Sequence, residues 1–247
     1  MKIIVYGYGV MGKKVVKAVK DDETMELVGV VSPVFDEKPD VPAYQSLAEV
    51  DGEVDGLIDF SHPANLESIL KFVTERKIPA VIATTGFNEK QLDDIHQASK
   101  ITPIFQSYNT SFGVAMLNKM VKEYTKVLYD HDFDVEILEA HHHRKIDAPS
   151  GTAEMLYNSA AEAIEGAHPV YDRHSRHQKR DRNEVGIQSL RAGTIYGEHT
   201  VLYGGDDELI EIKHTALSRD IFAKGAVSAM HALSDKEPGF YNLETLY

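Results

Sequence analysis

The chain of 247 residues carries 26 Lys and Arg against 39 Asp and Glu, a formal net charge of −13 that argues against nucleic acids and membrane surfaces as partners. The length allows one large or two modest domains, and hydrophobic residues at 43% suffice for a core. The lack of cysteine excludes disulfides and thiolate metal sites. We expect a cytoplasmic protein, because the opening Met-Lys-Ile-Ile-Val-Tyr-Gly is typical of a strand rather than a signal peptide, and no apolar run approaches the ~20 residues of a membrane span.

The N-terminal residues have the pattern of a strand, a glycine turn and a helix. An apolar run is followed at once by residues 7–12, Gly-Tyr-Gly-Val-Met-Gly, and then by apolar residues at helical spacing. In such a turn Gly7 permits the sharp bend, Gly9 lets the backbone approach a pyrophosphate, and Gly12 lets the helix pack closely on the strand. We therefore predict a dinucleotide-binding turn, and a turn without a ligand is the weaker alternative.

The residue that selects the cofactor is expected at the end of the second predicted strand, residues 27–31. An acidic side chain there would bind the ribose hydroxyls of NAD, but the chain continues with Ser32, and the next carboxylates come only at positions 36 and 37. Ser32 can bond a hydroxyl or a phosphate, and Lys13 or Lys14 is near enough in sequence to meet a 2′-phosphate. The sequence therefore slightly favours NADPH and leaves NADH open.

Three further strands in the first half alternate with helices, which implies a doubly wound parallel sheet. They are residues 56–60, 79–83 and 103–106. Ser61 is expected to cap a helix that runs to residue 77, and His62 is expected to start that helix rather than to act as a catalyst. Residues 84–86 and 107–111 follow strand ends, where open parallel sheets bind ligands.

The second half begins with a long predicted helix at residues 114–128 and changes character after residue 186. We expect strands at 133–139, 187–190, 194–196, 200–203 and 209–214, paired antiparallel where the connections are short. One face of this sheet would need cover, so an oligomer built through it is expected. The basic stretch at 167–183 is interpreted as a charged, mobile surface segment, and a role in holding an anionic ligand is the alternative without support. A last helix at 221–233 is expected to pack back on the first domain.

Titratable residues are concentrated in the loop that follows the strand ending at residue 139. It contains His141, His142, His143, Arg144 and Lys145, and Ser150 or Thr152 is expected to cap the helix that follows. A histidine can give a proton near neutral pH, a nearby lysine can hold a carboxylate or give a second proton, and the N–H groups of a helix start bind anions. A metal site is the weaker interpretation, because adjacent histidines on an extended chain point to opposite sides and no HExxH is present; a solvated polar loop is the other alternative.

The motif Glu136-Ile137-x-Glu139-x-His141-x-x-x-Lys145-x-Asp147-Ala148-Pro149-Ser150-Gly151-Thr152-Ala153 resembles the signature of the 4-hydroxy-tetrahydrodipicolinate reductase family. The resemblance covers the whole chain: it extends to Ile58-Asp59-Phe60-Ser61, Ala83-Thr84-Thr85-Gly86, Arg191-x-Gly193 with Gly197-Glu198-His199, and Ser218-Arg219 with Phe222-Ala223-x-Gly225-Ala226. The family pattern differs at Ser32, where an acidic residue is common, and at Tyr108-Asn109-Thr110-Ser111, where Ala-Asn-Phe-Ser is frequent.

The resemblance implies an α/β protein of two domains. A Rossmann-type, doubly wound parallel sheet at 1–110, completed by 217–247, would bind the dinucleotide. An α+β domain at 111–216, with a mixed or antiparallel sheet, would bind the substrate and build a homotetramer. The implied reaction is NADH- or NADPH-dependent reduction of a cyclic imine dicarboxylate, with loss of its 4-hydroxyl as water, in the diaminopimelate route to lysine.

The resemblance also implies roles for individual residues. His141 would be the catalytic proton donor and Lys145 the second catalytic donor, and no metal is implied. The substrate would be bound by His142, Ser150, Gly151 and Thr152. The cofactor would be bound by Gly7, Tyr8, Gly9, Val10, Met11, Gly12, Ser32, Ala83, Thr84, Thr85, Ser107, Tyr108, Asn109 and Thr110. Two alternatives remain: a related NAD(P)-dependent amino-acid dehydrogenase, and an NAD(H)-sensing module without catalysis.

Overall fold

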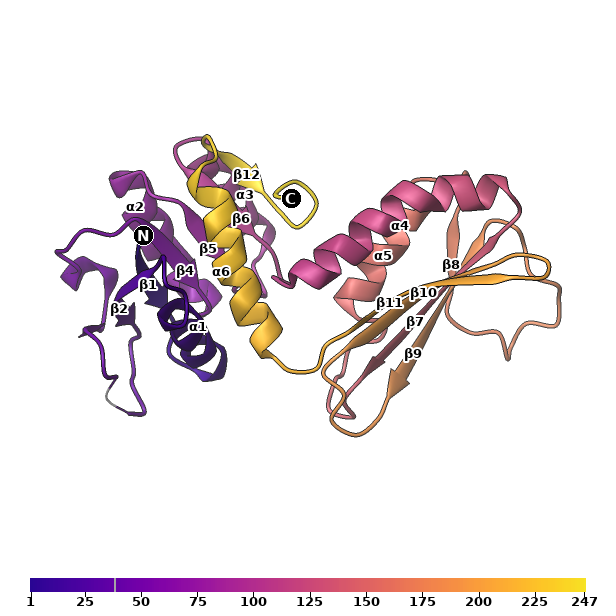
Figure 1. Ribbon diagram of the computed structural model, residues 1–247, viewed down its shortest axis with the longest axis horizontal. Coiled ribbons are helices and arrows are strands. Elements are labelled where there is room, and N and C mark those ends of the chain that lie inside the picture. Colours follow the sequence, from indigo (N-terminus) through magenta and orange to yellow (C-terminus); the bar gives the residue numbers. More distant parts are fainter. Residues whose placement is uncertain (38) are drawn as a thin grey trace. The chain divides into compact units, whose positions relative to one another are not determined.

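The computed structural model of the chain describes residues 1–37 and 39–247, which fold into two compact units. The first unit comprises Met1–Phe112 and Arg219–Tyr247, and the second Gly113–Ser218. Figure 1 traces the chain out of the first unit into the second and back, so the C-terminal segment completes the fold of the N-terminal one.

The first unit is built on a seven-stranded sheet in the order β12-β6-β5-β4-β1-β2-β3, with every pairing parallel. Its strands are β1 (Lys2–Tyr6), β2 (Glu26–Val31), β3 (Ala43–Tyr44), β4 (Gly56–Asp59), β5 (Ala80–Ile82), β6 (Pro103–Gln106) and β12 (Gly239–Tyr241). The predicted doubly wound parallel sheet is confirmed. The short edge strands β3 and β12 were not predicted from the sequence.

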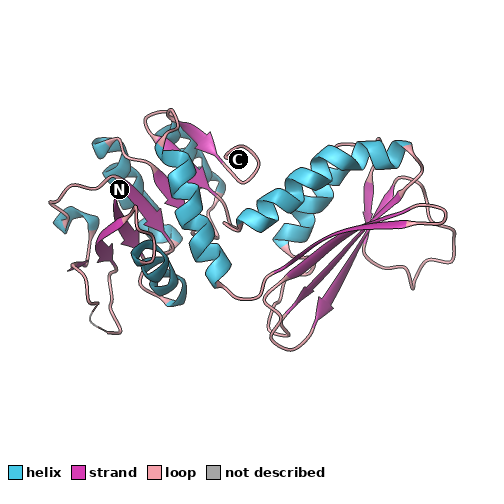
Figure 2. Ribbon diagram, in the orientation of Figure 1, coloured by secondary structure: helices cyan, strands magenta, loops and turns pink. Residues whose placement is uncertain are grey.

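Helices cover both faces of this sheet (Figure 2). They are α1 (Val10–Lys20), α2 (Leu66–Arg76), α3 (Glu89–Ser99) and α6 (Asp220–Ser234), with the 3-10 turns η1 (Leu47–Glu49) and η2 (Pro63–Asn65). Side chains of α2 and α3 share a buried cluster with Ile4 of β1, whereas Met230 of α6 lies with Ile3 beside Gly56. Since neighbouring residues of a strand face opposite sides, the two helix layers lie on opposite faces.

The start of the helix after β4 differs from the prediction. His62, rather than Ser61, caps the 3-10 turn η2, because its Nδ1 accepts the N–H of Ala64 at 3.1 Å. The expectation that Ser61 is the cap is therefore wrong, and the expectation that His62 is a helix-start residue is confirmed. Within the residues that the structure describes, no helix is long and apolar enough to cross a bilayer.

The glycine turn between β1 and α1 is packed too closely for side chains at two positions. Gly7 has φ +99°, a conformation that disfavours other residues, and a Cβ on it would lie 2.3 Å from the carbonyl oxygen of Phe60. A Cβ on Gly12 would lie 2.0 Å from the carbonyl oxygen of Gly7. A Cβ on Gly9, by contrast, would have no neighbour within 4 Å. Glycine is therefore required at position 12, where the helix packs on the turn, and at position 7, where the turn packs on the chain after β4.

The second unit contains a mixed five-stranded sheet in the order β11-β10-β7-β9-β8. Its elements are α4 (Phe112–Asp130), β7 (Asp134–His141), α5 (Gly151–Ala161), β8 (His168–Val170), β9 (Glu184–Arg191), β10 (Glu198–Gly204) and β11 (Leu209–Thr215). β10 runs antiparallel to β7 and β11, whereas β9 runs parallel to β7 and β8. The predicted α+β unit with a mixed sheet is confirmed.

Two details of this sheet correct the prediction. The strand expected at 194–196 is wrong, because that stretch is a loop between Gly193 and Gly197, both of which have positive φ. Strands β9 and β10 do not pair with each other, since β7 lies between them. The physical reason is the helical crossover through α5, which returns the chain parallel to β7 rather than as a hairpin.

Helices α4 and α5 cover one face of the second sheet, as Figure 1 shows. Tyr203 of β10 is fully buried beneath them, and its hydroxyl lies 2.8 Å from Thr125 Oγ1 of α4. On the opposite face Leu138, Leu190 and Leu209 are 38%, 60% and 66% exposed. The second unit thus leaves apolar side chains uncovered on the face that carries no helix.

The basic stretch at 167–183 is tied to the second sheet rather than projecting from it. It begins with β8, and Arg173 and Arg176 form ion pairs with the buried carboxylate of Glu184. Arg180 binds Asp134 at 2.8 Å and the carbonyl oxygen of Val135 at 3.0 Å. The expectation of a charged mobile segment missed these partners, because the sequence does not show which carboxylates lie nearby.

The close packing at Gly12 gives a stability prediction. Gly12→Ala forces a methyl group against the carbonyl of Gly7, so we expect a loss of ~1–3 kcal/mol in the free energy of unfolding, the usual cost of overpacking. Gly9→Ala is the matched control, with an expected loss under ~1 kcal/mol because only the helix cap changes. Urea denaturation followed by circular dichroism measures both, and equal losses would contradict the assignment of Gly12 to packing.

Candidate active site

The carboxyl ends of the parallel strands in the first unit surround a pocket of about 350 Å³. Its lining residues come from the start of α1, from the turns after β4, β5 and β6, and from the start of α6. They are Met11, Phe60, Ser61, Ala83, Thr84, Thr85, Tyr108, Thr110, Arg219 and Phe222. This is the edge of the sheet at which doubly wound folds bind ligands.

The glycine turn beside this pocket has the features that a pyrophosphate requires. Gly9 is the N-cap of α1 and provides no side-chain cap, and the first turn of the helix contains no acidic residue. Its N–H groups are therefore available to an anion, and the open space above Gly9 lets a phosphate approach the backbone. Tyr8 and Val10 flank Gly9 in the same turn. The residues present thus fit a dinucleotide.

The residues expected to select the cofactor are engaged with neighbours. Ser32 is buried after β2, and its hydroxyl donates to the carbonyl oxygen of Val34 at 2.5 Å, so it can only accept a further bond. The ammonium of Lys13 lies 3.0 Å from Glu37 and 5.4 Å from the Tyr8 ring centre, and Lys14 pairs with Asp220. A 2′-phosphate would have to compete with these carboxylates.

The loop after β6 is fixed to the C-terminal helix. Ser107 donates its hydroxyl to the carbonyl oxygen of Asn109 at 2.6 Å, and Thr110 Oγ1 donates to the carbonyl oxygen of Phe222 at 2.6 Å. Tyr108, between them, is 56% exposed and lines the pocket. The predicted residues Ser107 and Asn109 therefore shape this loop, while Tyr108 and Thr110 reach the cavity.

A buried carboxyl group immediately precedes two residues that line the pocket, Phe60 and Ser61. Asp59, the last residue of β4, is fully buried and accepts the N–H of Ser61 at 3.0 Å. Burial raises the pKa of Asp59 to about 6 against weaker opposing hydrogen bonds from Ser61 and Thr84. Its Oδ2 has no hydrogen-bond partner among the residues that the structure describes.

The candidate catalytic histidine of the second unit lies at the end of β7 rather than in the loop after it. His141 Nδ1 is 2.6 Å from Oε2 of Glu139, which is two residues earlier on the same face of the strand. Arg191 of β9 grips that carboxylate with two bonds, Nη1 to Oε2 at 2.9 Å and Nη2 to Oε1 at 2.8 Å. Burial would raise the pKa of Glu139, but bonds from Arg191, Ser189 and His141 outweigh it and lower the pKa to about 2.

Burial and the neighbouring charges have opposing effects on the pKa of His141. Burial lowers the pKa of His141 below its usual value, whereas the bond to Glu139 raises it, and the positive charges of Lys145 and Arg191 lower it again. The net effect is a pKa below the usual value, and negative charge brought close to the ring would raise it again. A dicarboxylate ligand would supply such charge.

The start of α5 is organised around Ser150. Ser150 caps the helix by accepting the N–H of Ala153 at 3.2 Å, and its own N–H donates to Oε1 of Glu139 at 3.3 Å. Its Oγ also lies 3.0 Å from His199 Nε2. Of the two capping hydroxyls predicted, Ser150 is the cap, and Gly151 and Thr152 follow in the first helical turn. The N–H groups of such a helix start can bind a carboxylate.

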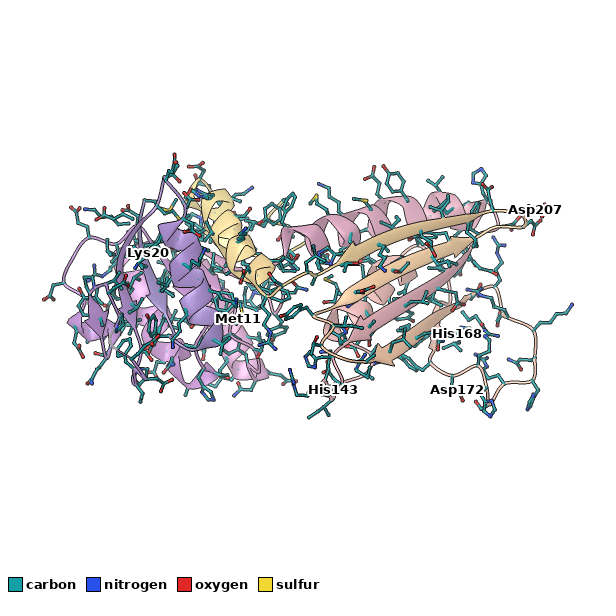
Figure 3. The ribbon with its side chains drawn as sticks, turned by 60° about the horizontal axis from the view of Figure 1, so that its bottom comes forward. Met11, Lys20, His143, His168, Asp172 and Asp207 are labelled. Carbon is teal, nitrogen blue, oxygen red and sulfur yellow. The ribbon has the colours of Figure 1, made fainter. Side chains whose placement is uncertain are left out.

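The loop between β7 and α5 is largely open to solvent. Lys145 is half-buried and its ammonium lies 2.8 Å from Asp147, and His142 is also half-buried. His143 and Arg144 are exposed. Figure 3 shows His143 at the end of the second sheet opposite Asp207, so the loop occupies the end at which β7 finishes.

Several residues that the structure brings into the two sites were not predicted as binding or catalytic residues from the sequence. Around His141 these are Glu139, Arg191 and His199, and at the pocket of the first unit Phe60, Ser61, Arg219 and Phe222. All of them belong to motifs that carry the family resemblance, and that was the available signal. Their partners are distant in sequence, so the motifs alone did not show the contacts.

Two family models match the chain almost end to end. "Dihydrodipicolinate reductase, N-terminus" matches residues 1–110, and "Dihydrodipicolinate reductase, C-terminus" matches residues 113–246. A 4-hydroxy-tetrahydrodipicolinate reductase of Exiguobacterium sibiricum is 48% identical over 100% of this chain and 96% of that protein. One of Staphylococcus aureus strain bovine RF122 is 43% identical, with 100% of both chains covered. The dipicolinate-bound dihydrodipicolinate reductase from Paenisporosarcina sp. TG-14 has the same fold, with a TM-score of 0.84 at 24% identity over 100% of this chain and 99% of that one.

The raised pKa of Asp59 gives a pH-dependent stability prediction. The folded protein keeps this proton up to pH about 6, while the unfolded chain releases it near its ordinary value of 3.8, so ionisation destabilises the fold as pH rises between these values. Asp59→Asn cannot ionise, so its stability relative to the wild type should rise by ~1–3 kcal/mol from pH 4 to pH 7. Urea unfolding across that range tests this with the exposed Asp51→Asn as control, and a pH-independent difference would contradict it.

Proposed function

The chain belongs to the dihydrodipicolinate reductase family, and from this premise we propose how its residues carry out the reaction. The protein is an NAD(P)H-dependent oxidoreductase that reduces (2S,4S)-4-hydroxy-2,3,4,5-tetrahydrodipicolinate to tetrahydrodipicolinate, with loss of water, in the diaminopimelate route to lysine. The observation that carries this conclusion is the match over the full chain at up to 48% identity. The amino-acid dehydrogenase and the NAD(H)-sensing module considered from the sequence are not favoured.

We propose that the first unit binds the dinucleotide and the second the substrate, in line with the predicted domains 1–110 with 217–247 and 111–216. When bound, NADH or NADPH supplies the hydride. In the first unit the N–H groups behind Gly9 would hold the pyrophosphate, and the pocket lined by Ala83, Thr84, Thr85 and Tyr108 would hold the nicotinamide half. The engaged hydroxyl of Ser32 is compatible with either cofactor.

In the second unit, three protein groups are proposed to act on the substrate: the ammonium of Lys145, the N–H groups at the start of α5 and the imidazole of His141. Gly151 and Thr152 would donate N–H bonds to one carboxylate, with His142 and Ser150 beside them. Lys145 would exchange Asp147 for a substrate carboxylate. The approach of this dianion would raise the pKa of His141 and so charge the imidazole in the complex.

His141 is then the proposed proton donor. Negative charge develops on the substrate ring as the hydride arrives, so an imidazolium and an ammonium beside it stabilise the transition state more than the ground state. Overall, the substrate gains one hydride and one proton and loses one water, formed from its 4-hydroxyl and a ring hydrogen. His141 gives the proton from its imidazole ring. Lys145 holds the substrate and stabilises the same charge.

We also propose a homotetramer in the cytoplasm, without nucleic-acid or membrane partners. The exposed leucines on the helix-free face of the second sheet support association through that face, because packing them against another copy would remove apolar surface from water. The acidic charge and the lack of cysteine support the other parts of this proposal.

The proton-donor role predicts the effect of two substitutions. His141→Gln should keep the KM for the cyclic imine and lose ~10²- to 10⁴-fold in kcat, the range typical of a missing general acid. Lys145→Ala should lose both affinity and turnover. The exposed neighbour His143→Gln is the matched control and should behave as the wild type. Oxidation of reduced cofactor at ~340 nm, run with NADH and NADPH in parallel, measures all three. Wild-type turnover by His141→Gln would refute the assignment.

The tetramer is tested by the mass in solution. Light scattering after size exclusion should give the mass of four 27.6-kDa chains, and Leu190→Arg, on the uncovered sheet face, should reduce it. Ile101→Arg changes an apolar residue of similar exposure in the first unit and should leave the mass unchanged. A wild-type monomer, or a tetramer that survives Leu190→Arg, would contradict this surface as the interface.

A further inference from the structure

We propose that Glu139 is the positioning residue for His141: its carboxylate holds the proton on Nδ1 of the imidazole and leaves Nε2 as the nitrogen that gives a proton to the substrate. The inference rests on the proton-donor role proposed for His141. It adds a residue to which sequence reasoning gave no role and a specific ring atom for the transfer.

The local geometry fixes the direction of the Glu139–His141 bond. The two residues are two positions apart on β7, so both point to the same face of the sheet. Oε2 lies 2.6 Å from Nδ1, and the side chain of Glu139 is fully buried. An ionised carboxylate can only accept hydrogen bonds, so Nδ1 carries the hydrogen in both the neutral and the charged ring.

Arg191 and Ser150 keep that carboxylate ionised and in place. The register pairs His141 of β7 with Arg191 of β9, which brings the guanidinium beside Glu139 for its two-bond grip. Arg191 also donates to the carbonyl oxygen of Asp147 at 2.6 Å, and Ser150 donates its N–H to Oε1. The carboxylate of Glu139 is thus connected to β9 and the loop through Arg191 and to the start of α5 through Ser150. Rotation of Glu139 away from His141 would break several of these hydrogen bonds.

On the opposite side of the ring, the position next to Nε2 is occupied by a glycine, Gly197. A Cβ on Gly197 would lie 3.1 Å from His141 Nε2, and Gly197 has φ +155°, so a side chain there is disfavoured on both counts. No hydrogen bond of Nε2 occurs with the residues in 1–37 and 39–247. Nε2 is therefore the ring nitrogen that can carry and release a proton.

Four groups from different elements face His141: Glu139 of β7, Arg191 of β9, His199 of β10 and Lys145 of the loop. His199 meets the ring edge-on at 5.2 Å, and burial with its neighbour His141 lowers its pKa to about 3, so it stays neutral. Arg191 and Lys145 oppose a charge on His141, and Glu139 is the negative member of the four. Removing the charge of Glu139 must therefore lower the pKa of His141.

The kinetic test is Glu139→Gln, read through a pH profile. The proton donor is active when charged, so kcat falls as pH rises through the pKa of His141 in the complex; the variant should move this alkaline limb to lower pH. Its kcat should fall ~10²- to 10⁴-fold while KM changes little, because the amide no longer fixes the ring. Glu136→Gln, on the other face of β7, is the matched control and should keep the wild-type profile. An unshifted limb with wild-type kcat in Glu139→Gln would overturn the proposal.

A second test needs no folded variant at position 139. Nitrogen-15 NMR of histidine-labelled wild-type protein distinguishes the two neutral tautomers, and His141 is assigned as the signal absent from His141→Gln. We expect hydrogen on Nδ1 and a bare Nε2, and hydrogen on Nε2 would overturn the proposal. Wild-type turnover by His141→Gln would refute the proton-donor role instead, so the two failures are distinguishable.

Discussion

The buried carboxylate of Glu139 is the constraint on which the second unit depends. A carboxylate without solvent is stable only if partners compensate its charge, and here Arg191, His141 and the N–H of Ser150 do so together. These partners come from β7, β9 and the start of α5. The requirement to satisfy one buried charge therefore brings the proposed proton donor and the proposed carboxylate-binding helix start to the same end of the sheet.

In the first unit the constraint is different, because an acidic chain has to bind a long anionic cofactor. In the proposed binding mode, the backbone rather than side-chain charge holds this cofactor. The N-terminus of α1 has no side-chain cap, and the turn before it leaves no room for a Cβ at Gly7 or Gly12. The lysines near this turn are already paired with carboxylates. A net charge of −13 is therefore compatible with binding an anion.

Local patterns predicted the features that depend on local physics. The glycine turn, the parallel strands of the first unit and the Ser150 cap follow from residue types and spacing within a few positions. The pairing of Glu139 with Arg191 joins residues 52 positions apart and depends on the register of β7 with β9. That register follows from the α5 crossover. The sequence analysis instead expected consecutive strands at 187–190, 194–196 and 200–203 to pair antiparallel, so it could not place β7 between β9 and β10. The prediction that Ser61 is the cap was wrong for a related reason. Both Ser61 and His62 can accept a backbone N–H, and only the folded structure shows that His62 does so.

The central claim is that the end of β7 and the start of α5 together bind and protonate a cyclic diacid. A crystal structure of the protein with its reduced cofactor and pyridine-2,6-dicarboxylate, an unreactive planar diacid, tests this most directly. The account predicts one carboxylate on the N–H groups of Gly151 and Thr152, with Nε2 of His141 within hydrogen-bond distance of the ligand. A diacid bound away from this helix start, with Nε2 of His141 facing only protein or water, would contradict it.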